Sequence, residues 1–410
     1  MLLDGMRVIS FCHYLHGPAA TQYLADMGAE VIKIEPPGGP LERKWSGGDS
    51  FVDGVSSFFL CANRNKRSLA IDLKHPDSEE IIHRIIKRSH VLVENFRPGV
   101  LERLGYGLEA ARKIRPDIIY ASATGYGSSG PMKDAAGQDL LAQARSGLIA
   151  ATGDYGLRPV PVGNAPIDQH GSTLLALGIV AAYVKQLQTG ESTRIESSLL
   201  NAGLDLQTEP LTAYMSQPDL TSDVFKRDPH LATWYHPAPY GIYQMADCFV
   251  AISMNNTAGP LADLLDSETL KELSATDLLK ERDAFARELA ILLRELRLSD
   301  MAEQLDQAGI WYARVQDYDD LRTDPQVAAN QVFREVPIGQ SKATLVNHPL
   351  RYDGKTPELR HVALRCGEDG RDILEELGFN EDQVQEYFSN RVLYEEPEGP
   401  QPGQRSDSGR

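Results

Sequence analysis

Residues 7–34, RVISFCHYLHGPAATQYLADMGAEVIKI, decide the fold of this chain. The runs 7–11 and 30–34 are short, apolar and rich in Val and Ile, which is typical of buried strands. Between them a helix is expected, because Pro18 favours a helix start and Gly28 favours a helix stop. A strand, a helix and a second strand in this order predict a βαβ unit.

The same alternation continues along the chain. Further strands are expected at 90–93 and 117–120, with helices near Pro76 and Ala110 before them. Repeated βα units of this kind predict a largely parallel sheet covered by helices. The expected fold class is therefore α/β, with a Rossmann-like parallel sheet in a large domain and a smaller α+β second domain.

The length of the chain favours two domains. It has 410 residues, and a single hydrophobic core stops growing at roughly 250–300 residues. We expect residues 1–224 and 326–394 to form the large domain, and residues 225–325, with strands near 239–252, to form the small one. The segment 395–410 is rich in Pro, Gly, Ser and charge, which predicts a disordered tail.

Composition narrows the possible partners. The net charge of −17 opposes a general affinity for nucleic acid or for an anionic membrane, so an anionic ligand needs a local basic pocket. No apolar run approaches the roughly 18 residues of a membrane span, and the N-terminus lacks the layout of a signal peptide. The four cysteines are far apart and form no CxxC pair, which predicts a reducing, cytoplasmic location and no metal site.

Several catalytic motifs are missing. The loop after the first expected strand, residues 12–18, contains no GxGxxG pattern. The main sequence signal of a dinucleotide-binding dehydrogenase is therefore missing at this position. The chain also lacks GxxxxGK[ST], HExxH and GxSxG, which argues against a P-loop enzyme, a zincin and a serine hydrolase.

Asp168, in the segment 166–171 (PIDQHG), is the strongest candidate for chemistry. A long apolar helix is expected over 172–188, and Gly190 suits its C-terminal cap. The positive end of the helix dipole favours an ionised carboxylate, as a nucleophile requires. An Asp before a helix is also a common cap, worth roughly 1 kcal/mol, and spacing alone favours the cap. The helix carries apolar residues at helical spacing, namely Leu174, Leu177, Ala181 and Val184.

Several separated segments extend over nearly the whole chain and carry a resemblance. They are Leu3-Asp4-Gly5-Met6-Arg7-Val8, Gly17-Pro18, the run from Leu24 to Glu35, the run from Asn65 to Lys74, Val93-Glu94-Asn95-Phe96-Arg97-Pro98-Gly99, and Asp168 one helix length before Thr189-Gly190. Together and in order they resemble the class III CoA-transferase family, which includes the formyl-CoA and carnitine CoA-transferases.

The resemblance implies a mechanism. A carboxylate attacks the acyl-CoA thioester to give a mixed anhydride, and the CoA thiolate then attacks the aspartyl carbonyl to give an aspartyl-CoA thioester. An incoming carboxylic acid reverses the two steps. By position Asp168 becomes the nucleophile, acyl-CoA and a small carboxylic acid become the substrates, and no permanently bound cofactor is needed. The resemblance also implies an interlocked homodimer.

The resemblance further implies where CoA and the reacting groups lie. Phosphate groups favour fixed cations with donor geometry, and surface charge is the alternative explanation for each basic residue. Asp139 is expected near the reacting centre or as a helix cap. His13 and His16 are expected to face the thioester carbonyl or to be polar surface residues. The residues expected to contact CoA are Leu73, Lys74, Asn95, Phe96, Arg97, Arg103, Gln138 and Asp139.

The chain departs from the family pattern at two places. Pro36-Pro37 stands where some members have Arg, which removes a phosphate contact unless Arg43 or Lys44 replaces it. The formyl-CoA transferases also resemble one another in a glycine run over the nucleophile, and residues 229–237 contain none, which argues against formate and oxalate. Instead, His230, Trp234 and His236 line a different acid pocket or serve packing.

Two alternatives remain at this stage. A 2-methylacyl-CoA racemase looks similar throughout, but its second base is a histidine, and the matching position here is Gln138, which cannot take up a proton. A non-catalytic CoA-binding protein would keep the fold without the chemistry.

Overall fold

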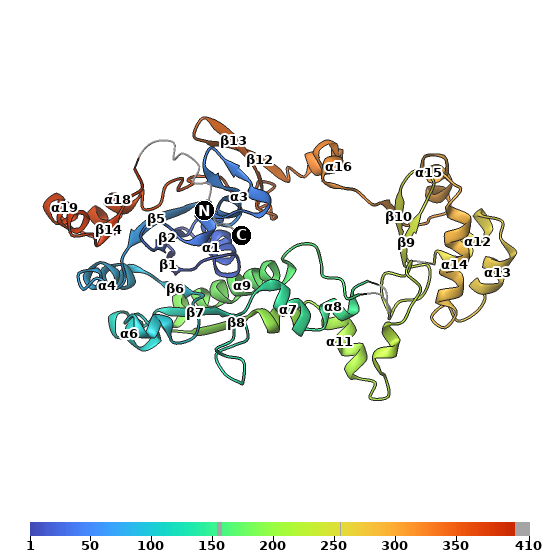
Figure 1. The fold of residues 1–410 in the computed structure, drawn as a ribbon, viewed down its shortest axis with the longest axis horizontal. Coiled ribbons are helices and arrows are strands. Elements are labelled where there is room, and N and C mark those ends of the chain that lie inside the picture. Colours follow the sequence, from blue (N-terminus) through green and yellow to red (C-terminus); the bar gives the residue numbers. More distant parts are fainter. Residues whose placement is uncertain (154–157, 255, 398–410) are drawn as a thin grey trace, which may run out of the picture. The chain divides into compact units, whose positions relative to one another are not determined.

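A computed structural model describes residues 1–153, 158–254 and 256–397, and the chain forms two compact units (Figure 1). The first unit contains Met1–Ala142, Ala165–Gly203 and the chain from Gln326 on. The second contains Gln143–Asn164 and Leu204–Pro325.

A seven-stranded sheet forms the centre of the first unit, in the order β14-β5-β2-β1-β6-β7-β8. Its strands are β1 (Arg7–Phe11), β2 (Glu30–Glu35), β5 (Lys66–Ile71), β6 (Val91–Glu94), β7 (Ile119–Thr124), β8 (Arg194–Ser198) and β14 (Leu393–Tyr394). All neighbours are parallel except β14, which runs antiparallel to β5. The large parallel sheet confirms the α/β class.

The βαβ unit predicted from residues 7–34 is the core of this sheet. Strands β1 and β2 pair in parallel, with Val8 opposite Val31, and α1 (His16–Asp26) connects them. The helix starts two residues before Pro18, so the loop after β1 is shorter than expected. Gly28 lies just beyond the helix with φ of 112°, a conformation that favours glycine.

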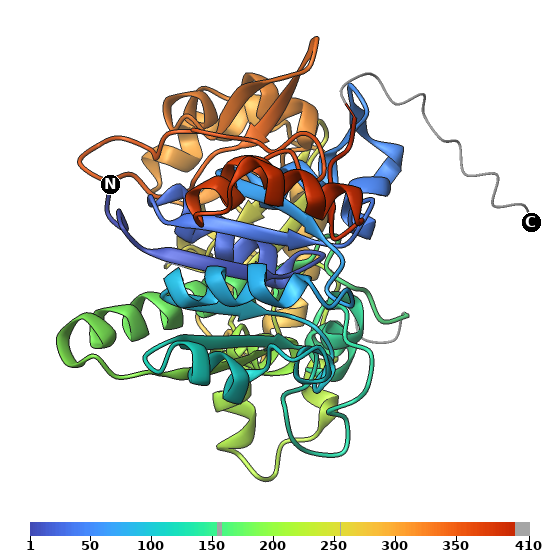
Figure 2. The same ribbon diagram turned by 90° about the vertical axis from the view of Figure 1, so that its left-hand side faces the viewer.

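Helices cover both faces of the sheet. On one face α1 packs with α9 (Pro166–Thr189) over Val91, Val93 and neighbouring strand residues. On the other face, Leu92 and its neighbours pack against α4 (Ser78–Arg88), α6 (Leu108–Ile114), α18 (Gly370–Glu376) and α19 (Glu381–Ser389), the face seen in Figure 2. Strand residues alternate between the two cores because successive side chains point to opposite faces.

Helix α9 buries a different stripe from the one that the sequence suggested. Its buried apolar residues include Leu175, Ile179 and Ala182, whereas Leu177 and Val184 are exposed. The helix is apolar on nearly all sides, so its composition does not distinguish the face that contacts the sheet from the face that does not.

The remaining elements of the first unit extend its edges. The antiparallel hairpin of β12 (Phe333–Ile338) and β13 (Ser341–Val346) packs on Leu60 of α3 (Ser57–Asn63), forming a small separate core. The other bounds are α2 (Leu41–Lys44), β3 (Phe51–Val52), β4 (Val55–Ser56), α5 (Val100–Arg103), α7 (Asp139–Arg145), α10 (Leu199–Asp205) and α17 (Pro325–Ala329).

The second unit has its own core, built on an antiparallel sheet in the order β11-β10-β9. Tyr243, Phe285 and Leu289 are fully buried in it. The elements of this unit are β9 (Gly241–Gln244), β10 (Phe249–Ile252), β11 (Tyr312–Arg314), α8 (Leu148–Ala151), α11 (Thr208–Met215), the 3-10 turn Ser222–Phe225, α12 (Ala258–Leu264), α13 (Glu268–Ser274), α14 (Arg282–Leu293), α15 (Leu298–Gln307) and α16 (Tyr318–Thr323). The first unit contains a further 3-10 turn, Gly47–Asp49.

The observed units differ from the expected domain bounds. Residues 143–164 and 204–224, expected in the large domain, fall in the second unit. At the C-terminal end, Glu396 accepts a hydrogen bond from the Cys366 N–H at 3.1 Å, so the ordered chain continues past residue 395. The rest of the expected tail, 398–410, lies outside the described residues. Among the described residues, no helix is both long enough and apolar enough to cross a membrane.

Candidate active site

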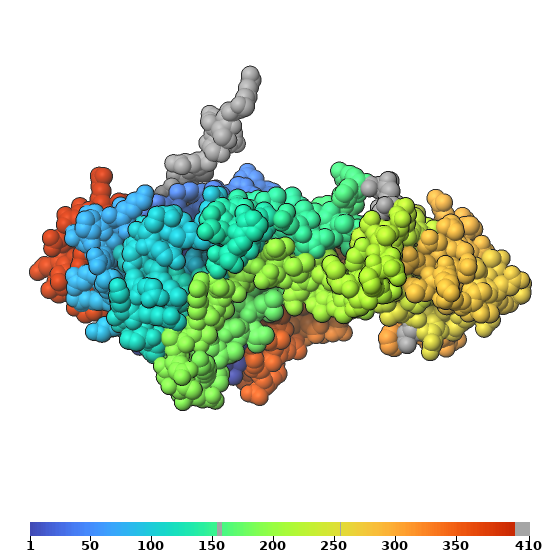
Figure 3. All heavy atoms as spheres, turned by 90° about the horizontal axis from the view of Figure 1, so that it is seen from below, coloured from blue at the N-terminus to red at the C-terminus, as the bar shows by residue number. Residues whose placement is uncertain are grey.

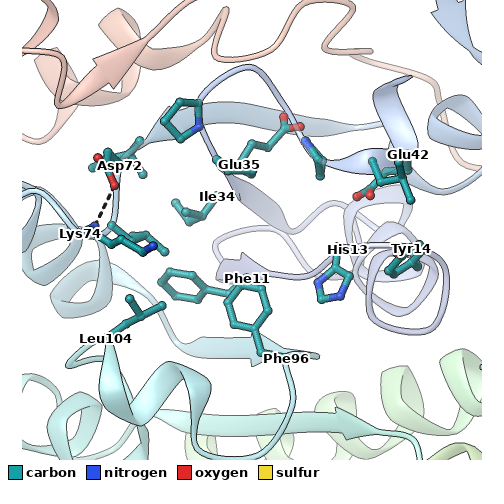
Figure 4. A pocket seen from close by; sticks show the side chains of 16 residues that line it. Phe11, His13, Tyr14, Ile34, Glu35, Glu42, Asp72, Lys74, Phe96 and Leu104 are labelled. Carbon is teal, nitrogen blue, oxygen red and sulfur yellow. Dashed lines mark hydrogen bonds between the residues drawn. The ribbon is translucent and has the colours of Figure 1, made fainter. Parts of the chain in front are cut away.

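A pocket of about 370 Å³ lies at the carboxyl ends of β1, β2, β5 and β6 (Figure 4). This edge is where parallel α/β sheets place their ligands. Most of the wall is apolar, and polar groups enter it only at His13, Glu35, Glu42, Asp72 and Lys74, together with the Tyr14 hydroxyl. The apolar lining is formed by Phe11, Ile34, Pro36, Pro37, Pro40, Leu41, Ile71, Leu73, Phe96 and Leu104.

The structure brings three of the expected CoA contacts to this pocket, namely Leu73, Lys74 and Phe96. Asn95 does not line it. Its side chain accepts a hydrogen bond from the His13 N–H at 2.9 Å and donates one to the His13 carbonyl at 2.7 Å. Asn95 therefore fixes the loop that follows β1, and this loop forms one wall of the pocket.

The expected cations lie on exposed positions around the same edge. Lys74 lines the pocket, while Arg103 ends α5 immediately before the pocket residue Leu104. Arg97 lies in the loop between β6 and α5. None of the three side chains makes an ion pair with a residue that the structure describes. They are thus available to an anionic ligand.

Arg43 does not take the place of the arginine that is missing at Pro36. Its guanidinium donates to Glu35 at 2.6 and 2.8 Å and lies 3.8 Å from the centre of the Phe59 ring. Because its charge is buried and paired, Arg43 serves the fold. Lys44 is exposed beside Gly38 and remains the alternative.

Asp168 lies in the first turn of α9, which begins at Pro166 with Ala165 as its cap residue. Asp168 is the third residue of the helix and not its cap residue, so the cap interpretation of Asp168 is wrong. Burial and, second, the charge of Asp139 raise the pKa of the Asp168 carboxyl to about 7. The sequence had suggested that the helix dipole favours ionisation, but burial beside a second carboxylate opposes it.

Asp139 is the first residue of α7 and lies close to the start of α9. Its Oδ2 accepts a hydrogen bond from the Ile167 N–H at 3.3 Å. Gln138, immediately before it, is exposed and does not line the pocket. Asp139, whose charge acts on Asp168, is thus placed beside the candidate nucleophile.

The two histidines of the first loop have different environments. His16 is buried as the first residue of α1, its Nε2 lies 3.1 Å from Ser197 Oγ, and burial lowers its pKa to about 4. His13 lines the pocket and stacks on Phe96 with ring centres 5.4 Å apart, and burial lowers its pKa. Both rings are thus neutral at pH 7. His13 is placed to contact a ligand, and His16 is placed to hold α1.

Helix α9 packs closely against α1 through two small residues, Gly171 and Ser172, whose role the sequence alone did not indicate. Ser172 Oγ lies 2.7 Å from the His16 carbonyl and 2.6 Å from the Asp168 carbonyl, and it can donate its hydrogen to either. Gly171 faces the His16 ring, because a Cβ added there would lie 2.8 Å from Nε2. The run Gly171-Ser172 directly after the candidate nucleophile is the signal that was available for this close packing.

Glu94, which was also missed, does not line the pocket but holds the backbone of the pocket residue Phe96. It ends β6, and its Oε2 accepts a hydrogen bond from the Phe96 N–H at 3.0 Å. Burial raises the pKa of Glu94 to about 7.

A GxGxxG pattern at 125–130 follows β7, but the next helix, α7, begins only at Asp139, so the pattern does not open a helix as a dinucleotide site requires.

One group of described residues has the composition of a metal site, namely His361, Glu368 and Asp369. Its carboxylates already serve the backbone. Asp369 accepts from the Ser68 N–H at 2.7 Å, and Glu368 accepts from the N–H groups of Leu364 and Arg365. These contacts give the group a structural role.

The aromatic residues considered for an acid pocket belong to the second unit and are packed there. His230 Nδ1 lies 2.7 Å from Asp228 Oδ1 and its ring stacks on Tyr243. Trp234 is 8% exposed, and His236 bonds Thr233. Within that unit, packing accounts for their positions.

Comparisons with known proteins identify the family of the chain. A model of CoA-transferase family III matches residues 3–370. The chain is 29% identical to acetyl-CoA:oxalate CoA-transferase of Acetobacter aceti over 382 residues, which cover 91% of this chain and 95% of that protein. It is 30% identical to succinyl-CoA:glutarate CoA-transferase of Homo sapiens over 344 residues, covering 82% and 76%. A CAIB/BAIF family protein from Brucella suis has a similar structure, with a TM-score of 0.79 at 27% identity, covering 92% of this chain and 99% of that one.

The chain therefore belongs to CoA-transferase family III. It is a CoA-transferase, an enzyme that moves coenzyme A between an acyl-CoA and a carboxylic acid. This confirms the family and the reaction class that the sequence segments indicated, and both relatives named above are CoA-transferases, not racemases.

The contact between α1 and α9 gives a first prediction. In Gly171→Ala the new Cβ meets His16 Nε2 at 2.8 Å and Ala202 Cβ at 3.3 Å, so the start of α9 must shift. Displacements near 1 Å at a reacting group cost about 100-fold in rate, and we expect CoA transfer to slow by roughly 10- to 100-fold. The matched control is Gly178→Ala in the same helix, whose Cβ meets Ile195 at 3.4 Å and is expected to leave the rate unchanged. Equal rates for the two variants would contradict the prediction.

Proposed function

We propose that Asp168 is the nucleophile of the transfer and that acyl-CoA binds in the pocket at the ends of β1, β2, β5 and β6. The observation that carries the proposal is the loop after β1. Its His13 lines the pocket, and the carbonyl of His16, three residues later, lies within hydrogen-bond distance of Ser172 Oγ, as does the Asp168 carbonyl. One short loop thus connects the binding pocket to the candidate nucleophile.

The Asp168 carboxylate attacks the thioester carbonyl and forms a mixed anhydride while the CoA thiolate leaves. The thiolate then attacks the aspartyl carbonyl, which releases the first acid and gives an aspartyl-CoA thioester. The second acid reverses both steps, and the exchange needs no bound cofactor. A carboxylate with a pKa near 7 is more basic than an ordinary one, yet at pH 7 it is ionised in about half of the molecules.

The phosphates of CoA are assigned to Lys74, Arg97 and Arg103, which are exposed and unpaired among the described residues. On a chain with a net charge of −17 these cations supply the local positive potential that an anionic ligand needs. Leu73 and Phe96 contribute apolar walls, and Asn95 acts through the His13 loop. Asp139 positions Asp168 and raises its pKa.

For the acceptor we propose a dicarboxylic acid, because both relatives compared above are named for one, oxalate or glutarate. The lack of a glycine run at 229–237 favours an acid other than oxalate. The four cysteines are free thiols, and on that basis we propose a reducing compartment, the cytoplasm.

A homodimer is proposed from the outer face of α9. Leu177, Val184 and Leu187 are 65%, 47% and 68% exposed, and the segment that contains α9 reaches the surface in Figure 3. Several exposed apolar residues on one helix are typical of an interface. The family resemblance adds that the two chains interlock.

The nucleophile is tested with Asp168→Asn, a neutral side chain of the same shape. We expect wild type incubated with acyl-CoA to gain a covalent CoA adduct by intact mass, and the variant to gain none. Transfer from succinyl-CoA or acetyl-CoA to a panel of short carboxylic acids should fall at least about 10³-fold.

Two measurements control the Asp168→Asn experiment. The pKa of Asp168 is raised from its usual value of 3.8 to about 7, so its cost to folding grows as the pH rises between these two values and is complete above about pH 7. The variant should therefore unfold at the same or a higher temperature than wild type at pH 8. Asp134→Asn, at an exposed position, should keep the adduct. An adduct on Asp168→Asn would overturn the assignment.

The raised pKa of Asp168 predicts a pH profile. The ratio kcat/KM should rise with pH and level off above about pH 7, as Asp168 loses its proton. Asp139→Asn removes the neighbouring negative charge, so the rising limb should move to lower pH. A limb that stays in place or moves upward in this variant would show that Asp139 does not act on the ionising group. Asp134→Asn again serves as the control.

The dimer is tested by light scattering of the wild type and of Leu187→Glu. Wild type should have twice the mass of one chain, and the variant should dissociate, because a carboxylate buried in an apolar interface is costly. Gln188→Glu adds the same charge at the next position of α9, which is also exposed. We expect the Gln188→Glu dimer to dissociate less readily than the Leu187→Glu dimer. A monomeric wild type would contradict the proposal.

A further inference from the structure

Glu42 is a buried carboxylate with one oxygen unused. It lies in the short helix α2 and is fully buried. Its Oε1 accepts a hydrogen bond from Lys33 Nζ at 3.1 Å, and Lys33 also donates to the Cys12 carbonyl at 2.7 Å. Its Oε2 has no hydrogen-bond partner within the described part of the chain. A buried acceptor without a partner is costly, and native structures rarely leave one without a reason.

The side chain of Glu42 belongs to the wall of the pocket. Figure 4 shows its carboxylate on the same side of the pocket as His13 and Tyr14, away from Asp72 and Lys74. His13 and Tyr14 carry donors on this side of the pocket, but neither makes a hydrogen bond with Oε2, and the other walls are mainly apolar. A hydrogen-bond donor on a bound ligand is therefore the natural partner of the unused oxygen.

The charges of the pocket fix the direction of an acyl-CoA in it. Lys74 and Arg103, which precedes the pocket residue Leu104, supply two cations on one side that make no ion pair with described residues, against the single carboxylate of Asp72. The phosphates therefore belong on that side and not beside Glu42. The His13 side continues through the loop to His16 and the start of α9. The portion of acyl-CoA between its phosphates and its thioester is the pantetheine arm, which contains two amide N–H groups.

We infer that Glu42 Oε2 accepts a hydrogen bond from an amide N–H of the pantetheine arm and so selects for that arm. The inference rests on the proposed binding of acyl-CoA in this pocket. A charged acceptor binds an amide N–H more strongly than a neutral one does. The hydrogen bond from Lys33 holds the Glu42 carboxylate in place, and the bound amide completes the hydrogen bonding of Oε2.

The test is the binding of three ligands, measured by calorimetry. They are CoA, adenosine 3′,5′-bisphosphate, which lacks the pantetheine arm, and a CoA analogue in which the pantetheine amides are replaced by esters. In Glu42→Gln the side-chain carbonyl keeps the bond from Lys33, and the group facing the pocket becomes a donor. We expect this variant to bind CoA roughly 10- to 100-fold more weakly, and adenosine 3′,5′-bisphosphate as tightly as wild type does.

The ester analogue gives a test that needs no variant to fold. It should bind wild type at least about 10-fold more weakly than CoA, and Glu42→Gln should bind it no more weakly than wild type does. The control variant is Asp134→Asn, which removes the same charge at an exposed position outside the pocket and is expected to bind CoA as tightly as wild type does. Its result separates a specific hydrogen bond from a general change in charge.

The outcomes distinguish the inference from the proposed function. If wild type binds neither CoA nor adenosine 3′,5′-bisphosphate, the proposed binding pocket is wrong. If wild type binds CoA and Glu42→Gln binds it equally well, only the inference fails. Equal weakening of CoA and adenosine 3′,5′-bisphosphate would assign Glu42 to the adenine amino group and overturn the pantetheine contact, as would full binding of the ester analogue.

Discussion

The close packing of α1 against α9 is the constraint on which the candidate site depends. Both helices begin at the carboxyl edge of the parallel sheet, and Ser172 Oγ lies within hydrogen-bond distance of the carbonyls of both first turns. Gly171 allows this approach because it leaves room for the buried His16 ring. The strand order therefore places the loop after β1, the pocket and Asp168 in one neighbourhood, although Asp168 lies more than 150 positions further along the chain.

Electrostatics divide the charged residues near this edge into two groups. Arg43, Glu35, Lys33 and Glu42 are buried and paired, and they shape the pocket wall. Lys74, Arg97 and Arg103 are exposed and make no ion pair with described residues, so they remain available to a ligand. Sequence position alone did not separate the groups, because Arg43 looked as suitable for phosphate as Lys44 did.

Strands β1, β2, β6 and β7 were predictable because each contains an apolar run with Val or Ile, whereas β5 (KRSLAI) and β8 (RIESS) carry charged and polar residues and were not predicted. Lys74 and Phe96, which the resemblance implied as CoA contacts, do line the pocket, and their role there stays a prediction. What failed required three-dimensional packing. The buried face of α9 could not be identified because Leu177 and Ile179 are equally apolar, and the pKa of Asp168 depends on burial and on Asp139, 29 positions away. Glu42 carries no motif, and its unused oxygen appears only in the fold.

The strand β14 has a consequence for how the chain matures. It is formed by Leu393 and Tyr394 and covers the outer edge of β5, whereas β5 itself is complete by Ile71. Throughout synthesis of the intervening 321 positions, from 72 to 392, that edge lacks its final neighbour. An open strand edge is a template for pairing with other chains. The nascent protein is therefore open to aggregation at this edge until β14 has left the ribosome and paired with β5.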